Sequence, residues 1–259
     1  TALVRGGQLR KSGTNDSAVW QLGWGEIAEN LKGQPITVEA LRPQYFRDQP
    51  CRLSGRYVMP LAPGFEYDVG IVLRRLFFDE FLGGYQSIVE FGSGTGINLL
   101  LLATQFPGTR LSGCDWATPS RDILLEMGQQ QNRPIGAHIF NMLIAEGWDG
   151  APIDRGSAVL TVHAMEQLDD KWRPFLHYLL ARQPGLVLHI EPIFDFYDES
   201  PFDRIAASYH LERKYLKGYY SYLRELENSG KIEIVAARRV AFGGFYHDAN
   251  SVLAWRPKL

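Results

Sequence analysis

The chain has 259 residues, of which 45% are hydrophobic and 22% are charged. This length fits one large domain, or one ordinary domain with an appendage, and the composition excludes a disordered chain, a collagen and a coiled coil. Lysine and arginine number 27 against 29 aspartates and glutamates, which leaves a net charge of −2. Because the positive and negative charges are nearly equal in number, the chain has no overall electrostatic field that would attract nucleic acid or a membrane surface. Neither is expected as a partner.

The cysteines indicate the compartment. Cys51 and Cys114 have neither a CxxC neighbour nor zinc-like spacing, so reduced thiols are expected and no metal site is predicted. The most apolar stretch, residues 97–103, is too short to cross a bilayer, and no signal peptide is visible. A cytoplasmic location is therefore expected. Because the chain begins at Thr1, other domains of a longer chain stay open as partners.

Residues 1–64 lack the regular pattern of an independent domain. Residues 1–17 are polar and without period, and we expect a mobile tail there. Residues 20–64 contain five prolines between short apolar patches, which predicts a short helix or two and loops laid over another domain. The sequence thus predicts an N-terminal extension, part mobile and part packed on a core that begins at residue 65.

Residues 65–259 alternate between helical and strand patterns. Apolar residues at helical spacing predict a helix over 65–82. Strands are then predicted over 87–91, 110–114, 137–140, 158–162 and 186–190, with helices over 97–105, 120–131 and 171–181. This alternation is typical of a parallel sheet covered on both faces. Two last strands, over 231–242 and 251–255, predict an antiparallel hairpin. The predicted fold class is α/β, a doubly wound sheet of seven strands.

The segment Ile88-Val89-Glu90-Phe91-Gly92-Ser93-Gly94-Thr95-Gly96 carries the strongest functional signal. An apolar strand leads into an acid and three glycines at alternate positions, and a predicted helix follows. Such glycines let the backbone come close to a ligand, and a helix start contributes free N–H groups. Asp115 ends the next predicted strand, 19 residues after Gly96, where an acid can accept both hydroxyls of a ribose. The pattern indicates a nucleoside site; a tight turn without ligand is the simpler reading.

Two alternative functions follow from the same loop. A dinucleotide enzyme would place its third glycine at position 97, where this chain has isoleucine. An NAD-dependent oxidoreductase is therefore the second hypothesis. The third is a non-catalytic, cofactor-binding scaffold within a larger protein.

On Glu90-Phe91-Gly92-Ser93-Gly94-Thr95-Gly96, together with Asp115 and Trp116, the chain resembles the class I S-adenosylmethionine-dependent methyltransferases. The resemblance covers about residues 65–259, and the predicted C-terminal hairpin looks like that family's last two strands. It implies a Rossmann-like fold, S-adenosyl-L-methionine (SAM) as cofactor and methyltransferase activity (EC 2.1.1.-).

The resemblance also implies a cofactor site, made of Glu90, Gly92, Ser93, Gly94, Gly96, Asp115, Trp116, Asn141, Met142 and His163. The loop from Gly92 to Gly96 would line the methionine part, with Glu90 near its ammonium group. Asp115 would hold the ribose, and Trp116 would pack on adenine. Asn141 and Met142 follow the third strand and would reach the adenine edge, with Asn141 standing where the family often has Asp. His163 ends the fourth strand, close to the sulfonium.

The loop after the fourth strand, residues 163–167, bears on the methyl acceptor. It lacks the Asn/Asp-Pro-Pro-Tyr and Pro-Cys sequences of enzymes that methylate bases, so a small-molecule acceptor is predicted. His163 and Glu191 end neighbouring strands and could meet across the crevice, where either could act as a base. His210 is a third candidate base. For His163 and Glu191 a structural role, as a polar residue satisfied by backbone or as a loop anchor, stays open.

A helical substrate cover is predicted over about residues 195–229, beginning near Phe202 behind Ser200 and Pro201 and interrupted at Gly218. Tyrosines on this segment could stack on a ring of the acceptor. The substrate-binding candidates are Tyr67, Glu166, Glu191 and Tyr209. A hydroxyl of a sugar or nucleotide-sugar and an amine of an amino-acid-like metabolite both stay open, with the hydroxyl slightly favoured. Four acids, Asp195, Asp198, Glu199 and Asp203, would suit the amine.

Overall fold

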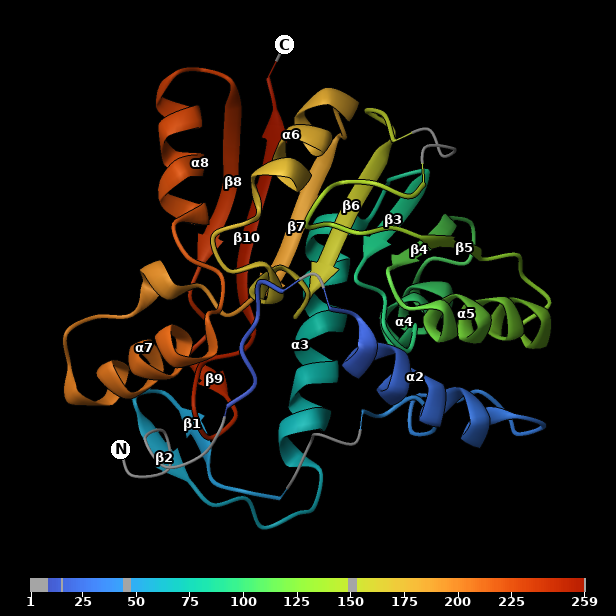
Figure 1. Ribbon diagram of the computed structural model, residues 1–259, viewed down its shortest axis with the longest axis horizontal. Helices are drawn as coiled ribbons and strands as arrows, with labels where there is room; N and C mark the ends of the chain where they lie inside the picture. Colours follow the sequence, from blue (N-terminus) through green and yellow to red (C-terminus); the bar gives the residue numbers. More distant parts are fainter. Residues whose placement is uncertain (1–8, 15, 44–47, 149–152, 259) are drawn as a thin grey trace.

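The computed structural model describes residues 9–14, 16–43, 48–148 and 153–258. Within them, the main sheet has seven strands in the order β5-β4-β3-β6-β7-β10-β8 (Figure 1). The strands are β3 Ser87–Phe91, β4 Arg110–Asp115, β5 Gly136–Ile139, β6 Ser157–Val162, β7 Leu186–Glu191, β8 Ile232–Arg238 and β10 Ser251–Pro257. Strands β3 to β7 pair in parallel, and β10 pairs antiparallel with both β7 and β8. The predicted fold class, with its antiparallel hairpin, is confirmed.

Helices cover both faces of this sheet. Buried side chains of α3 (Phe65–Leu82), α4 (Ile97–Gln105) and α5 (Thr118–Gln130) belong to one hydrophobic cluster. Those of α6 (Arg173–Arg182) and α8 (Tyr219–Asn228) belong to the other. Every residue of β6 and β7 is buried, as expected of central parallel strands.

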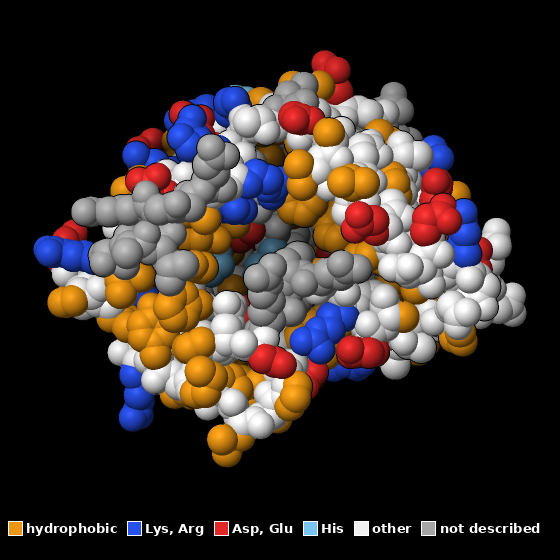
Figure 2. All heavy atoms as spheres, turned by 60° about the horizontal axis from the view of Figure 1, so that its bottom comes forward, with side chains coloured by type: hydrophobic (Ala, Val, Ile, Leu, Met, Phe, Trp, Pro, Cys, Tyr) orange, Lys and Arg blue, Asp and Glu red, His pale blue; other side chains and the backbone are white. Residues whose placement is uncertain are grey.

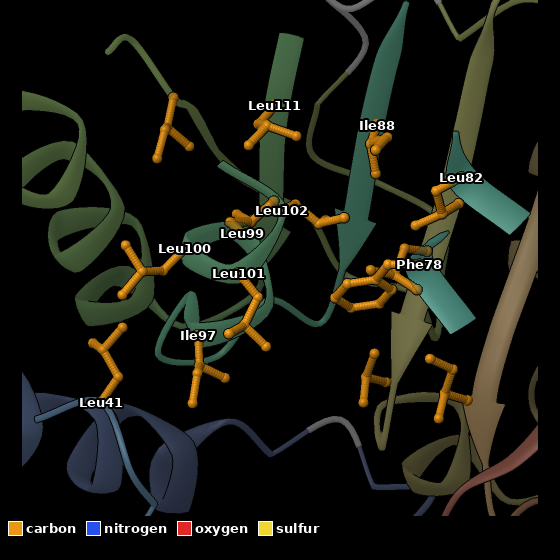
Figure 3. Packing of buried hydrophobic residues seen from close by; sticks show 14 of the residues in the cluster. Leu41, Phe78, Leu82, Ile88, Ile97, Leu99, Leu100, Leu101, Leu102 and Leu111 are labelled. Atoms are coloured by element: carbon orange, nitrogen blue, oxygen red, sulfur yellow. The ribbon is translucent and has the colours of Figure 1, made fainter. Parts of the chain in front are cut away.

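Helix α4 lies deep in the first cluster. Its first six residues are all buried, and Leu41 and Phe78 pack close to them (Figure 3). A helix that is apolar on all sides is stable only when it is surrounded. Each buried leucine contributes about 1.5–3 kcal/mol relative to an exposed one. This packing holds the start of α4, and with it the glycine loop, in one place.

The described part of the N-terminal segment is joined to the core. Helix α2 (Ala18–Leu31) packs on α5, and the hairpin of β1 (Cys51–Leu53) and β2 (Arg56–Val58) pairs through β1 with β9 (Phe242–Gly243). This three-stranded sheet crosses the predicted boundary at residue 65. Ser12 and Gly13 donate backbone hydrogen bonds to the carbonyl groups of Arg213 and Gln167. The mobile tail expected over residues 1–17 stays a prediction, and its residues 1–8 and 15 lie outside the described residues.

One element departs from the sequence prediction, whereas the helical cover agrees with it. The strand predicted over 231–242 ends at Arg238, because the next side chain, Arg239, turns inward to Asp203 and Asp248. The cover contains two long helices, α7 (Pro201–Arg213) and α8, besides the short η2 (Phe194–Phe196). Ser200 caps α7 by accepting from the backbone N–H of Asp203, and Gly218, with φ of 72°, precedes α8.

The described ranges contain neither a candidate membrane-spanning helix nor a candidate metal-binding cluster. None of their helices is both long and apolar enough to span a membrane. The same ranges hold no group of three or more His, Cys, Asp or Glu side chains placed to bind a metal ion.

Candidate active site

A pocket lies at the carboxyl ends of the central parallel strands, where doubly wound sheets bind ligands. In Figure 1 the arrowheads of β3 and β6 point down to the level of α2, which lies across this edge. The lining residues are Trp20, Trp24, Gly92, Asp115, Trp116, Phe140, Asn141, Met142, Leu143, His163, Ala164, Gln167 and Leu168. The structure thus brings Gly92, Asp115, Trp116, Asn141, Met142 and His163 of the predicted cofactor site to one pocket.

The glycine loop bends tightly because three of its residues have left-handed φ angles. These angles are 73° at Gly92, 52° at Gly94 and 77° at Gly96, a region that favours glycine. A Cβ on Gly92 would lie 2.3 Å from the Cβ of Ala164, and one on Gly96 would lie 2.4 Å from a methyl group of Leu124. Gly92 therefore permits close approach of the loop after β6, whereas Gly96 permits packing of α5.

The N–H groups of this loop are bonded within the protein. Gly92 and Ser93 both donate to the carbonyl oxygen of Cys114, at 2.7 and 3.1 Å. Gly94 donates to Asp115 Oδ2 at 2.9 Å, and Gly96 donates to the Ser93 carbonyl at 2.8 Å. Ser93 is buried and does not line the pocket. The loop is a braced turn, with these four donors already used.

Asp115 reaches the pocket from the end of β4. Its Oδ2 accepts from Gly94 and its Oδ1 accepts from the N–H of Ala117 at 2.9 Å, yet 7% of the residue stays exposed. Burial raises the pKa of Asp115 to about 6, and the backbone hydrogen bonds oppose this shift. Each oxygen retains lone-pair capacity for a further donor. Asp115 can therefore brace the loop and accept from a ligand hydroxyl at once.

Glu90 lies behind the loop rather than on the pocket wall. It is fully buried, and its Oε1 accepts from Asn98 Nδ2 at 2.6 Å. Its Oε2 has no hydrogen-bond partner, and burial raises the pKa of this carboxyl to about 8. Asn98 in turn accepts from Arg74 Nη1 at 3.3 Å. A buried carboxyl oxygen without a partner is costly unless a ligand or water supplies a donor.

Asn141 is held by its own turn. Its Oδ1 accepts from the N–H of Leu143 at 2.9 Å, and its backbone exchanges two hydrogen bonds with Glu146. This places Met142 and Leu143 on the pocket wall, opposite the end of β4. Together with Trp116 they make up an apolar part of the lining of the pocket that Asp115 also lines.

Two tryptophans that sequence reasoning missed form another wall. Trp20 and Trp24 of α2 stack with ring centroids 5.5 Å apart, and the Trp24 ring lies 3.1 Å from where a Cβ on Gly94 would stand. Gln21, between them, accepts from the N–H of Thr118 at 3.1 Å and so ties α2 to the start of α5. The one signal available was the aromatic pair at spacing i, i+4, which places both rings on one helix face.

His163 stands at the end of β6 with a φ of 54°, an uncommon value for a residue other than glycine. Its Nε2 lies 3.4 Å from Asn250 Oδ1, an atom that can only accept, so Nε2 carries the proton and Nδ1 keeps its lone pair. Burial, then the charge of Arg74 and the neighbouring His247, lowers the pKa of His163 to about 3. His163 is thus a neutral imidazole on the pocket wall.

Glu191 does not meet His163 as a free base. It is fully buried, and Oε1 accepts from the N–H groups of Ala164 and Met165 at 3.0 Å each. Oε2 accepts from the N–H of Glu166 at 3.3 Å. Of the two roles that the sequence left open, this geometry favours the loop anchor, which fixes the turn that carries His163.

A buried chain of hydrogen bonds lies behind Glu191. Trp255 Nε1 donates to His189 Nε2 at 3.1 Å, so that nitrogen is an acceptor and Nδ1 carries the proton. His189 Nδ1 then donates to Thr161 Oγ1 at 2.8 Å. The Thr161 hydroxyl also bonds Glu191 and lowers the pKa of that carboxyl, against the larger effect of burial that raises it to about 7. The loop after β6 is therefore held by Glu191, which is itself held by side chains of the neighbouring strands β6, β7 and β10.

Glu166 follows on this loop, within η1 (Met165–Leu168). It is 7% exposed, and its Oε1 accepts from Gln167 Nε2 at 2.7 Å. Its Oε2 lies 4.0 Å from His163 Nδ1 and has no hydrogen-bond partner. Burial and the nearby Glu191 raise the pKa of Glu166 to about 8. The structure therefore places this substrate-binding candidate beside His163.

His210 and Tyr209 lie on α7 in an aromatic group away from the glycine loop. His210 is 1% exposed, and its Nε2 lies 3.0 Å from His247 Nδ1. Burial lowers the pKa of His210 well below its ordinary value. Tyr209 stacks on Tyr246 with ring centroids 4.5 Å apart. Neither His210 nor Tyr209 lines the pocket.

Tyr67 and the acidic segment lie elsewhere. The Tyr67 hydroxyl donates to the Val38 carbonyl at 2.6 Å, so this residue joins α3 to the N-terminal segment rather than lining the pocket. The acids that would suit an amine bond residues of the cover instead. Asp195 accepts from Ser221, Asp198 from the N–H of Ser200, Glu199 from Arg204, and Asp203 from Arg52 and Arg239. No described acid of this segment lines the pocket.

The buried titratable groups predict how stability varies with pH. Burial lowers the pKa of four histidines, His163, His189, His210 and His247, below the ordinary 6.5. Above pH 6.5 these neutral histidines do not reduce the free energy of unfolding. As the pH falls below 6.5, the unfolded chain binds more protons than the folded chain does, and the free energy of unfolding decreases. Burial raises the pKa of four acids, Glu90, Asp115, Glu166 and Glu191, and their contribution is lost as the pH rises toward about 8.

We therefore expect the free energy of unfolding to be highest between about pH 4.5 and 6.5 and to fall on both sides. Chemical denaturation at a series of pH values measures this. Glu90→Gln, which cannot ionise, should flatten the alkaline side and leave the acid side unchanged. Stability that rises steadily from neutral to alkaline pH would contradict the assignment of these buried acids.

Neither the models of known protein families nor the sequences of curated proteins give a match to this chain. Solved structures do match. A mitomycin 7-O-methyltransferase has a TM-score of 0.52 at 14% identity, over 73% of this chain and 54% of its own. The chain has the class I SAM-dependent methyltransferase fold.

Two further structures have the same fold. Human N-acetylserotonin methyltransferase, solved in complex with SAM, has a TM-score of 0.50 at 13% identity over 74% of this chain and 53% of its own. A third structure comes from work on the conversion of a disulfide bond into a thioacetal group during echinomycin biosynthesis. It has a TM-score of 0.50 at 12% identity, over 71% of this chain and 81% of its own. The chain thus spans about half the length of the first two. The fold predicted from the glycine loop and Asp115 is confirmed.

Proposed function

We propose that this chain is a SAM-dependent methyltransferase that acts on a hydroxyl of a small molecule. The observation that carries the proposal is the placement of Asp115 and His163 on one pocket beside the glycine loop. SAM would supply a methyl group on a sulfonium, which a nucleophilic oxygen can displace. The protein has then to hold the cofactor, orient the acceptor and take up its proton.

The lining residues fit a nucleoside with a free diol. Trp116 and Met142 give the pocket lining an apolar part, as an adenine ring requires, and the Asp115 carboxylate in the same lining can accept from ribose hydroxyls. The methionine part would follow the Gly92 side of the loop. Glu90 Oε2, behind that loop, has no hydrogen-bond partner among the described residues and would accept from an ammonium group, directly or through water, once this carboxyl, whose pKa burial raises to about 8, has lost its proton.

The same loop argues against a dinucleotide. A pyrophosphate is bound by free backbone N–H groups at a glycine turn. Here the N–H groups of Gly92, Ser93, Gly94 and Gly96 are already bonded inside the protein. The acceptor of the Gly94 bond is the carboxylate of Asp115, which would also repel a phosphate. A sulfonium nucleoside carries no phosphate and needs none of these donors.

A hydroxyl acceptor fits the pocket better than an amine. The acids expected to bind a cation are bonded within the cover, whereas the neutral His163, with a free Nδ1 lone pair, lines the pocket. With a pKa of about 3 it is a weak base. Proton transfer to such a base is most favourable from an acidic hydroxyl, so a phenol suits it better than a sugar hydroxyl.

The proposal is tested by calorimetry on the purified chain with SAM, S-adenosylhomocysteine (SAH) and NADH. We expect SAM and SAH to bind with dissociation constants near micromolar, about −8 kcal/mol, and NADH not to bind. Binding of NADH without SAM would overturn the proposal in favour of an oxidoreductase. Binding of SAM without SAH production from any acceptor in a metabolite extract would favour the non-catalytic scaffold.

His163→Gln tests the base. Glutamine preserves a polar side chain of similar reach but cannot take up a proton, so the rate of SAH formation should fall at least tenfold. This expected effect is smaller than is usual for general-base catalysis, because the imidazole of His163 is a weak base. Calorimetry should show unchanged SAM affinity. His177→Gln, on α6 and outside the pocket lining, is the matched control. An undiminished rate would remove His163 from this role.

A further inference from the structure

Two arginines that make no ion pair with a described Asp or Glu lie next to the loop that follows His163, and we call this part of the pocket its mouth. Arg10 Nη2 donates to Gln167 Oε1 at 3.0 Å, and its guanidinium lies 4.3 Å from the ring centroid of Trp20. Gln167 and Trp20 both line the pocket. Arg213, at the end of α7, donates to the Tyr215 hydroxyl at 2.9 Å, and its Nε is buried without a hydrogen-bond partner. We call Arg10 and Arg213 the arginine pair.

The two side chains of the arginine pair are close enough for the charge of Arg213 to affect Arg10. Burial, followed by the Arg213 charge, lowers the pKa of Arg10. The backbone joins them as well, because Ser12 donates to the Arg213 carbonyl at 2.8 Å. Two like charges brought together and partly desolvated are unfavourable unless an anion lies between or beside them.

The described residues do not supply that anion in full. Neither arginine makes an ion pair with any described Asp or Glu. The acid whose charge acts on Arg10 is Glu166, and burial together with the nearby Glu191 raises the pKa of this carboxyl to about 8, which disfavours its ionised form. Even an ionised Glu166 would leave one positive charge in excess. The mouth of the pocket is therefore electrostatically complementary to an anion.

Aromatic rings surround the same place. Tyr209 and Tyr215 flank Arg213, with ring centroids 6.0 and 5.0 Å from its guanidinium carbon, and Trp20 stands beside Arg10. Figure 2 shows a hollow on this side of the molecule, with histidine side chains inside it and Arg or Lys side chains at its edge. Planar rings and guanidinium groups together suit a flat molecule that carries a carboxylate.

We infer that the methyl acceptor is an aromatic hydroxy acid, whose carboxylate is bound by Arg10 and Arg213 while its hydroxyl faces His163. This inference rests on the proposed function and specifies its substrate class. The arginine pair lies beside Gln167 and Glu166, the residues that follow His163 on one loop. The arginine pair would hold the carboxylate end of the acceptor, and His163 would face its hydroxyl end. Two such contacts would fix the orientation of the acceptor, and methyl transfer requires this alignment.

The test is calorimetry on the chain saturated with SAH. The probes are hydroxybenzoates, hydroxyphenylacetates and hydroxycinnamates, each paired with its neutral amide. We expect at least one acid to bind about tenfold or more tightly than its amide, the effect of a charge-assisted hydrogen bond. Arg10→Gln and Arg213→Gln should each remove most of this preference, and Arg213→Lys should retain part of it. Arg204→Gln, exposed on the same helix α7, is the control and should retain all of it.

SAH binding, measured first, reports on the proposed function alone. If SAH binds and acids and amides bind equally, the inference is wrong while the proposed function stands. Failure of every acid to bind up to millimolar concentration overturns it as well. So does a preference for acids that survives both glutamine variants, because the anion would then bind elsewhere.

Discussion

Replacing Asp115 with alanine should weaken SAM binding at least a hundredfold. The carboxylate is the one acidic side chain on the pocket wall among the described residues. Two charge-assisted hydrogen bonds to a ribose are worth about 3 kcal/mol or more, which is about a hundredfold in affinity. The variant also loses the acceptor of the Gly94 and Ala117 N–H groups, so the glycine loop should loosen. Calorimetry with SAM measures the affinity, and thermal unfolding measures the loosening.

Asp115→Asn separates the two effects. Asparagine retains one oxygen for the backbone but loses the charge and an acceptor, so it should restore much of the stability and little of the affinity. Asp122→Ala, on the exposed side of α5, is the matched control and should change neither. Unchanged SAM affinity in both Asp115 variants would displace Asp115 from the ribose site.

Glu191→Ala is expected to destabilise the fold by about 3–5 kcal/mol. The substitution leaves the N–H groups of Ala164 and Met165, both bonded at 3.0 Å, and that of Glu166 without their acceptor in a buried place. The loop that carries His163 should then lose its fixed position. Chemical denaturation measures the stability, and the rate of SAH formation should fall together with it.

Glu191→Gln distinguishes an anchor from a base. Glutamine still offers one oxygen to the loop, so part of the stability should return, and the activity with it. A catalytic carboxylate would instead lose its activity in Glu191→Gln as completely as in the alanine variant. Glu199→Ala, 92% exposed in its side chain, is the control and should be neutral.

Local patterns predicted the core elements well. The helices over 65–82 and 97–105 and the strand over 87–91 have the bounds that the sequence predicted. The reason is that these segments carry their own periodicity and end at glycines or at a polar turn. The β1–β2 hairpin was not predicted, since strands of three residues show no alternation that could be read. Nor was the end of β8, which depends on where Arg239 finds its partners.

The site residues divide in the same way, into those that local sequence indicates and those that only distant contacts place. Asp115 and Gly92, which line the pocket, could be predicted as site residues because strand, turn and spacing lie within one stretch of chain. Glu191 was placed correctly at the end of its strand, but its direction was decided by the N–H groups of the neighbouring loop. Trp24 was missed because nothing near it in sequence connects it to Gly94.

The succession of strands and helices along the chain, the glycine turn and the acid that ends the next strand were determined by the sequence, because each depends on local patterns in the chain. What closes the pocket and what charge its mouth carries were decided by tertiary structure alone. Arg10 reaches Gln167 across 157 positions, and Thr118 reaches Gln21 across 97. Periodicity carries no information over such separations, since these contacts exist only once the sheet and its helices have packed.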